Sequence, residues 1–152
     1  MKLVKFTEKL AKKYVSWKYI TPYDIYNLPT WEEMKQKEYK ATTQKGRKNY
    51  FAYVEDDAFL GVVSFKETSD NIYIGIAISP NLCGKGLGAK VLAQALKDFD
   101  KKNNRTKPFY SEVRSWNQRS IKTFQKCGFV VLETKKCKGK DGDFEGVCLQ
   151  QK

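Results

Sequence analysis

The sequence predicts an α+β fold: a mixed, mostly antiparallel sheet of six to seven strands flanked by about four helices. Two observations lead to this fold class. Residues 51–78 contain three short runs rich in β-branched and aromatic residues, whereas residues 86–99 and 117–127 carry apolar residues at helical spacing. We therefore expect one sheet whose strands are connected partly by hairpin turns and partly by helices. A chain of 152 residues is expected to form a single domain over residues 1–152.

The first half of the chain is expected to begin with a strand and to continue with helical segments. Residues 3–6 are a candidate strand, and residues 23–26 and 31–39 are candidate helices with prolines as breaks. Residues 51–54 and 59–65 flank an acidic turn, a pattern typical of a hairpin. In residues 72–78 isoleucine occupies every second position, which predicts a strand that Pro80 ends.

The second half alternates helices and strands. Residues 86–99 predict a helix with one buried face, and residues 108–113 predict the next strand. A helix is expected over residues 117–127, with Asn117 as its N-cap and Gly128 as its stop. Residues 129–133 and 144–149 predict two last strands, joined by a loop over residues 138–143.

Composition limits the environment and the chemistry. No run approaches membrane-spanning length and the first 15 residues lack a signal-peptide core, so we expect a soluble, cytoplasmic protein without a membrane partner. The four cysteines are dispersed without a C-x-x-C pair, which predicts free thiols and no metal site. Because the chain has no histidine, acid–base chemistry must use carboxylates, tyrosine, cysteine, lysine or water.

The formal charge of +12 is compatible with nucleic acid, an acidic substrate or an anionic coenzyme. Lysines are scattered through almost every segment and only four arginines occur, which favours a solvated lysine coat. A nucleic-acid partner is therefore not expected.

Three glycines in the run Cys83-Gly84-Lys85-Gly86-Leu87-Gly88 directly follow a strand and directly precede a helix. Such a turn offers unpaired N–H groups and a helix N-terminus to a phosphate. The run lacks the G-x-x-x-x-G-K-[ST] pattern of NTPases, and its G-x-G-x-G spacing differs from the dinucleotide fingerprint. The sequence thus predicts an anion cradle of another kind.

A second motif lies downstream, where Asn117, Ser120, Ile121, Phe124 and Gly128-Phe129 follow the pattern N-x-x-[A/S]-I-x-x-[Y/F]-x-x-x-G-F. Together with the glycine run, it resembles the GNAT superfamily of N-acetyltransferases. The resemblance covers residues 50–150 and implies the acyl-CoA N-acyltransferase fold in a small, bacterial-type member.

The resemblance implies acetyl-CoA as cosubstrate and direct transfer of its acetyl group to a primary amine. The pantetheine arm would lie along residues 76–78 and contact Asn117, and the pyrophosphate would lie on the glycine run. The implied cofactor-binding residues are Ile76, Ala77, Ile78, Cys83, Gly84, Lys85, Gly86, Leu87, Gly88 and Asn117.

Two residues depart from the family pattern. Cys83 stands where the family usually has arginine or glutamine, so pyrophosphate binding must rely on backbone amides and Lys85. Phe124 replaces the tyrosine that in many members protonates the departing thiolate. Either Tyr73, Tyr110 or Cys127 serves instead, or the thiolate leaves without an enzymatic acid; we favour the second alternative.

The general base and the acceptor are less defined. Glu112 and Glu67 are the candidate catalytic carboxylates, and a water chain is a further alternative. The acceptor is expected to be an amine of a small molecule or a protein, bound against an early aromatic cluster: Trp17, Tyr19, Tyr23, Tyr26 and Trp31. A catalytically impaired acyl-CoA sensor or binding module is the alternative function, and the protein is expected to be a monomer or homodimer.

Overall fold

The computed structural model describes all residues, 1–152, and is built on one seven-stranded sheet. The strand order is β1-β2-β3-β4-β5-β7-β6, and only the β4–β5 pair is parallel. This confirms the predicted mixed, mostly antiparallel sheet. The strands are β1 (Lys2–Val4), β2 (Tyr50–Glu55), β3 (Ala58–Glu67), β4 (Ile72–Ile78), β5 (Phe109–Arg114), β6 (Val130–Gly139) and β7 (Gly142–Gln151).

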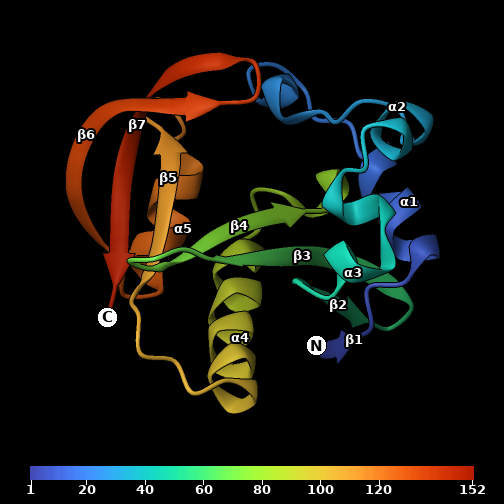
Figure 1. The fold of residues 1–152 in the computed structure, drawn as a ribbon, viewed down its shortest axis with the longest axis horizontal. Helices are drawn as coiled ribbons and strands as arrows, with labels where there is room; N and C mark the ends of the chain where they lie inside the picture. The colour runs from blue at the N-terminus through green and yellow to red at the C-terminus, as the bar shows by residue number, and fades with distance from the viewer.

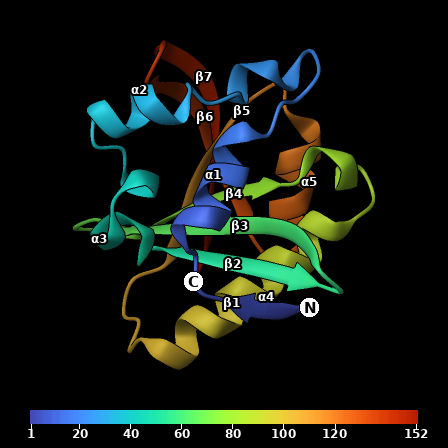
Figure 2. The ribbon, with the colours of Figure 1, turned by 90° about the vertical axis from the view of Figure 1, so that its right-hand side faces the viewer.

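Five α-helices and three 3₁₀ turns cover the sheet. The α-helices α1 to α3 gather at one side of the molecule, on the right in Figure 1 and facing the viewer in Figure 2. The α-helices are α1 (Glu8–Ser16), α2 (Trp31–Gln36), α3 (Gln44–Arg47), α4 (Leu87–Lys102) and α5 (Gln118–Lys126). The 3₁₀ turns are η1 (Tyr23–Tyr26), η2 (Lys40–Thr42) and η3 (Pro80–Leu82).

The two faces of the sheet carry separate apolar clusters, because alternate residues of a strand point to opposite faces. Phe51 and Tyr53 of β2 belong to the main core, which the buried faces of α4 and α5 complete. Ala52, between them, belongs to a smaller cluster with Phe6 and Ala11 beneath the N-terminal helices. The sheet is thus held between two helical layers.

Strands β4 and β5 separate soon after they meet. They pair only at Ile72–Phe109 and Tyr73–Tyr110, and the Ser111 hydroxyl then donates a hydrogen bond to the Ile74 carbonyl oxygen at 2.9 Å. Beyond this point β2 to β4 run across the view of Figure 1 while β5 to β7 run vertically. The sheet therefore opens into a gap along the second half of β4.

The structure adds one helix to the predicted elements and corrects two predicted boundaries. Helix α1 was not predicted, because its three lysines obscure a short buried face made of Ala11 and Val15. The helix predicted over residues 31–39 ends at Gln36, before Glu38, whose φ is 53°. The loop predicted over residues 138–143 is mostly strand, because β6 and β7 pair up to Gly139–Gly142 and leave only a two-residue turn.

No helix in the structure combines the length and the apolar character needed to cross a membrane.

Candidate active site

A cavity of about 390 Å³ lies where β4 and β5 diverge. Strands β4 and β5 form one wall, α5 forms another, and N-terminal aromatic residues close the third. Eight of the predicted site residues line the cavity: Ile76, Ala77, Ile78, Cys83, Gly88, Glu112, Asn117 and Phe124. Segments far apart in the sequence therefore meet at one concave site.

The edge of β4 presents unpaired peptide groups to this cavity. The Ser79 N–H donates to the Leu60 carbonyl of β3 at 2.9 Å, and peptide groups of alternate residues point to opposite edges of a strand. Ile76 and Ile78 therefore direct their N–H and C=O groups into the gap. The Tyr19 hydroxyl donates to the Ile78 carbonyl oxygen at 2.8 Å, and the Cys83 Sγ lies 3.6 Å from the same oxygen, so this oxygen already has partners within the protein.

The glycine run forms an open turn before α4. Gly84 and Gly86 have φ values of 78° and 76°, a region that favours glycine, and a Cβ at either position would meet nothing within 4 Å. Gly86 is the N-cap of α4, and no side chain caps the first turn of this helix. The first amides of α4 are thus free to bind an anion.

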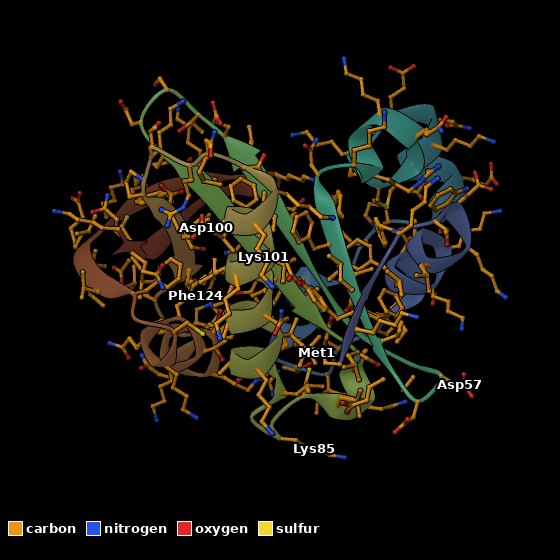
Figure 3. The ribbon with its side chains drawn as sticks, turned by 90° about the horizontal axis from the view of Figure 1, so that it is seen from below. Met1, Asp57, Lys85, Asp100, Lys101 and Phe124 are labelled. Carbon is orange, nitrogen blue, oxygen red and sulfur yellow. The ribbon has the colours of Figure 1, made fainter.

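Only part of the glycine run reaches the cavity. Cys83 and Gly88 line it, whereas Gly84, Lys85 and Gly86 of the turn and Leu87 at the start of α4 do not. The Lys85 side chain is exposed and extends away from the body of the molecule (Figure 3).

Cys83 is half-buried below the Ile78 and Ser79 carbonyl oxygens, with its Sγ 3.6 and 3.5 Å away. Burial raises the pKa of the Cys83 thiol, and the positive charge of Arg119 opposes this increase. The Arg119 guanidinium lies 3.9 Å from the centroid of the Tyr23 ring and lines the cavity. Arg119 was not predicted as a functional residue, although it lies within the second motif.

Asn117 confirms its predicted role as the N-cap of α5. The side chain is buried; its Oδ1 accepts a hydrogen bond from the Ser120 N–H at 3.1 Å. Its Nδ2 donates to the Tyr26 hydroxyl at 3.0 Å, across 91 residues of sequence. Asn117 therefore links the start of α5 to the N-terminal aromatic wall of the cavity.

Phe124 places a ring, without a hydroxyl, in the cavity wall. It is 1% exposed and packs edge-on against Phe129 at 5.0 Å, with its side chain inside the fold in Figure 3. Of the three alternative acids, only Tyr73 lines the cavity, and burial raises its pKa to about 12. Tyr110 and Cys127 do not line it; the Cys127 thiol donates to the Ala89 carbonyl oxygen instead.

The two candidate carboxylates occupy different places. Glu112 lines the cavity, and its Oε2 accepts a hydrogen bond from the Tyr110 hydroxyl at 2.8 Å. Glu67 is the last residue of β3 and is paired with Ile72 at the start of β4, the end of that strand opposite to the gap. Its carboxylate lies 2.9 Å from the Lys107 ammonium, and it does not line the cavity. The structure therefore brings Glu112 alone to the site.

Most of the predicted aromatic cluster closes the cavity. Trp17, Tyr19, Tyr23 and Tyr26 line it, joined by Tyr14, which was not predicted. Trp31 lies outside this wall, and the Lys12 ammonium lies 5.5 Å from its ring centroid.

A splayed parallel strand pair, a glycine turn at a helix start and a cavity between them define a protein of the acyl-CoA N-acyltransferase fold. A family model, "Acetyltransferase (GNAT) family", matches residues 10–129. The chain belongs to this family, as its two motifs predict. Family membership confirms the acetyltransferase class and acetyl-CoA as the cosubstrate of that class.

One similar protein is the acetyltransferase PseH of Campylobacter jejuni subsp. jejuni serotype O:23/36 (strain 81-176). It is 26% identical over 113 residues, which are 74% of this chain and 66% of PseH. The matched region thus spans just under two thirds of that protein.

Solved structures show the same fold at low sequence identity. An acetyltransferase (GNAT family) from Bacillus anthracis superimposes with a TM-score of 0.76 at 17% identity, covering 98% of this chain and 92% of its own. The aminoglycoside acetyltransferase AAC(6')-Ib in complex with coenzyme A has a TM-score of 0.73 at 18% identity, with the same two coverages.

Proposed function

We propose that the protein is an acetyl-CoA-dependent N-acetyltransferase that moves an acetyl group directly to a primary amine of a small molecule or a protein. One observation carries this proposal. The unpaired edge of β4 faces a cavity that ends, past Cys83, at the free helix start after the glycine turn. An extended arm with a pyrophosphate at one end and a thioester at the other fits this arrangement.

The coenzyme would be held mainly by backbone groups. The pantetheine arm would pair with Ile76 and the N–H of Ile78 like an added strand, and the pyrophosphate would lie on the amides of residues 84–88. Asn117 would contact the arm from the other side. Arg119, close enough to Cys83 to influence its pKa, would supply the positive charge that Cys83 lacks.

Glu112 would accept the proton of the attacking ammonium group, directly or through one water, because it is the only carboxylate in the cavity wall. The deprotonated amine would then attack the thioester carbon and expel the coenzyme thiolate. A phenol with a pKa of about 12, as in Tyr73, is a weaker acid than the departing thiol, whose pKa is about 8.5. The thiolate would therefore leave without an enzymatic acid.

The acceptor would carry little positive charge beyond its reacting amine. The cavity lining has two charged side chains, the carboxylate of Glu112 and the guanidinium of Arg119. Glu112 would attract one ammonium group, but Arg119 would repel a further positive charge on the same acceptor. The aromatic wall favours an acceptor with a flat apolar or sugar-like face. Aminoglycosides, after which the structural relative AAC(6')-Ib is named, are thus poor candidates for this chain.

Calorimetry with acetyl-CoA and a thiol-release assay over a panel of amines and peptides test the proposal. Saturable binding and thiol release with at least one monoamine are expected. Gly86→Val would place a β-branched side chain at a left-handed position inside the anion cradle, and affinity should fall about tenfold or more.

Gly142→Ala is the matched control for Gly86→Val. Gly142 also has a positive φ, 115°, with open space around it, but it lies in the β6–β7 turn away from the cavity. It should lower the melting temperature while leaving acetyl-CoA affinity intact. Equal affinity losses in both variants, or no acetyl-CoA binding at millimolar concentration, would refute the proposal.

A coenzyme sensor is the second candidate, because Phe124 leaves the family's usual acid position without a hydroxyl. Tight acetyl-CoA binding with thiol release at background over the whole panel would establish the sensor and exclude the enzyme. Release above background with any amine would do the reverse.

A further inference from the structure

Two cysteines and one glutamate that are dispersed in the sequence meet beside the cavity. The Sγ atoms of Cys137 and Cys148 and a carboxylate oxygen of Glu112 all lie within 4.8 Å of one another. Both cysteines are at most 3% exposed. We propose that Glu112, Cys137 and Cys148 form a zinc-binding site that adjoins the cavity at Glu112, a role that goes beyond the proposed acetyl transfer.

Strand register places the three side chains on one face of the sheet. Cys148 is directly opposite Glu112 in the β5–β7 pair. Cys137 is opposite Phe144, which lies four residues before Cys148 on β7 and therefore on the same face. This face is opposite to the one that α4 and α5 cover, since Ser111 and Val113, the neighbours of Glu112, point into the core.

Gly146 is the reason that the two thiols can approach. It lies between Phe144 and Cys148 on β7, and a Cβ built there would be only 2.6 Å from the Cys137 Sγ. The Cys137 thiol therefore occupies the space of the missing side chain and leans toward Cys148. Any other residue at position 146 would displace it.

The distances suit one zinc ion. Zinc lies about 2.3 Å from thiolate sulfur and about 2.0 Å from a carboxylate oxygen, so two ligands of one tetrahedral ion are about 3.4–3.8 Å apart. Atoms within 4.8 Å need to close by about 1 Å, which small side-chain rotations provide. Two sulfur ligands and one oxygen favour Zn²⁺ over Mg²⁺ or Ca²⁺, which require mainly oxygen ligands.

The surroundings resemble those of a metal centre with one open position. The Tyr110 hydroxyl donates to Glu112 Oε2 at 2.8 Å, which orients the carboxylate and leaves its other oxygen for the metal. Because Glu112 lines the cavity, zinc and a water molecule as fourth ligand can enter from there. On binding, the two thiol protons leave to the solvent.

A disulfide is the competing use of the two thiols. It requires Cα atoms within about 7 Å, whereas the β6–β7 register offsets Cys137 from Cys148 by four residues. A metal bridges sulfur atoms without bringing them into bonding contact, and this offset therefore favours zinc.

Cobalt and zinc titrations of the full chain, reduced with a non-thiol phosphine and freed of metal, test the site. One equivalent of Co²⁺ should bind and give the thiolate charge-transfer and tetrahedral visible bands, and Zn²⁺ should displace it stoichiometrically. Cys137→Ser and Cys148→Ser should each weaken Zn²⁺ binding by about 100-fold or more, and Tyr110→Phe by about tenfold.

Cys127→Ser is the matched control, because the Cys127 thiol donates a hydrogen bond to the Ala89 carbonyl oxygen in α4 and lies outside the cluster. It should bind cobalt as the parent does. Absence of thiolate bands in the parent, equal loss of binding in Cys127→Ser, or a Cys137–Cys148 disulfide in the protein handled in air would overturn the proposal. Circular dichroism of each variant separates loss of a ligand from loss of the fold.

A consequence for catalysis rests on the proposed function. A bound zinc ion would hold the Glu112 carboxylate, so that it could not accept the proton of the amine, and acetyl transfer would fall as the site fills. In Cys148→Ser, added zinc should lower acetyl transfer less than in the parent, with each protein compared with its own activity in chelator. Zinc binding without inhibition would refute the role of Glu112 as base and leave the metal site standing.

Discussion

Glu112 is the only carboxylate in a cavity wall made mainly of aromatic and aliphatic side chains. If it accepts the proton of the acceptor amine, Glu112→Gln should lower kcat by about 100-fold or more and leave acetyl-CoA affinity within about twofold. This substitution removes the negative charge of the side chain and keeps its shape. Single-turnover thiol release, measured beside calorimetric binding, separates the two effects.

Glu67→Gln serves as the comparison at the residue level. This substitution removes an exposed ion pair with Lys107 at the opposite end of β4 and touches no cavity residue. Activity close to that of the parent is expected. Equal losses of kcat in both variants would mean that neither carboxylate is the base and that the effect comes from stability or net charge.

Cys83 offers a chemical probe of coenzyme binding. Burial raises the pKa of its thiol, so a smaller fraction is thiolate at pH 8 than for an unperturbed cysteine, and alkylation by iodoacetamide should be slow. The rate should increase with pH until the raised pKa is passed. Because Cys83 lines the cavity, saturating acetyl-CoA should protect it, as measured by peptide mass spectrometry.

Cys127 is the internal comparison for this experiment. It is also half-buried, but its thiol bonds to Ala89 and it does not line the cavity. Its alkylation should be unaffected by acetyl-CoA. Protection of both cysteines alike would indicate a general tightening of the fold and would not support coenzyme contact at Cys83.

At the level of elements, the start of α5 combines a structural task with a position at the cavity. Asn117 caps the helix through Oδ1 and holds Tyr26 through Nδ2. Serine is as good an N-cap as asparagine but has no amide to donate, whereas alanine can do neither. The two tasks can therefore be separated by substitution.

Asn117→Ala should lower the free energy of unfolding by about 1 kcal/mol, whereas Asn117→Ser should stay close to the parent. If the amide also holds the pantetheine arm, both variants should bind acetyl-CoA equally weakly. Urea unfolding and calorimetry give the two quantities. Parent-like affinity in Asn117→Ser would restrict Asn117 to its capping role.

At the level of the whole molecule, the gap between β4 and β5 leaves backbone groups of β4 without strand partners, and a bound ligand is expected to pair with them. The amides of Ile76 and Ile78 face the gap, whereas the amide of Ala77 faces β3. Hydrogen exchange followed by NMR should therefore show Ile76 and Ile78 exchanging quickly in the free protein and slowly with acetyl-CoA. Ala77 should be protected in both states.

Hydrogen exchange also tests the added-strand arrangement against a looser one. If the coenzyme lay across the cavity without pairing to β4, the three amides would change together or not at all. Alternation along one strand is expected only from a partner that pairs with its edge.

Local patterns were enough to predict much of the fold. The alternating isoleucines of residues 72–78, the helical spacing of residues 86–99 and the capping pair Asn117–Gly128 each depend on neighbours close in sequence. Short-range patterns failed where tertiary contacts decide the structure. Helix α1 contains three lysines and buries only Ala11 and Val15, and its stability comes from packing on the sheet.

The sequence by itself determined the mixed sheet, the glycine turn and the family to which the chain belongs, because these follow from periodicity and from two local motifs. The tertiary structure alone decided which distant side chains meet. It placed Arg119 beside Cys83, brought Glu112 and not Glu67 to the cavity, and gathered Cys137 and Cys148 around Glu112. Register and strand divergence set these neighbours, and neither has a signature in a single sequence.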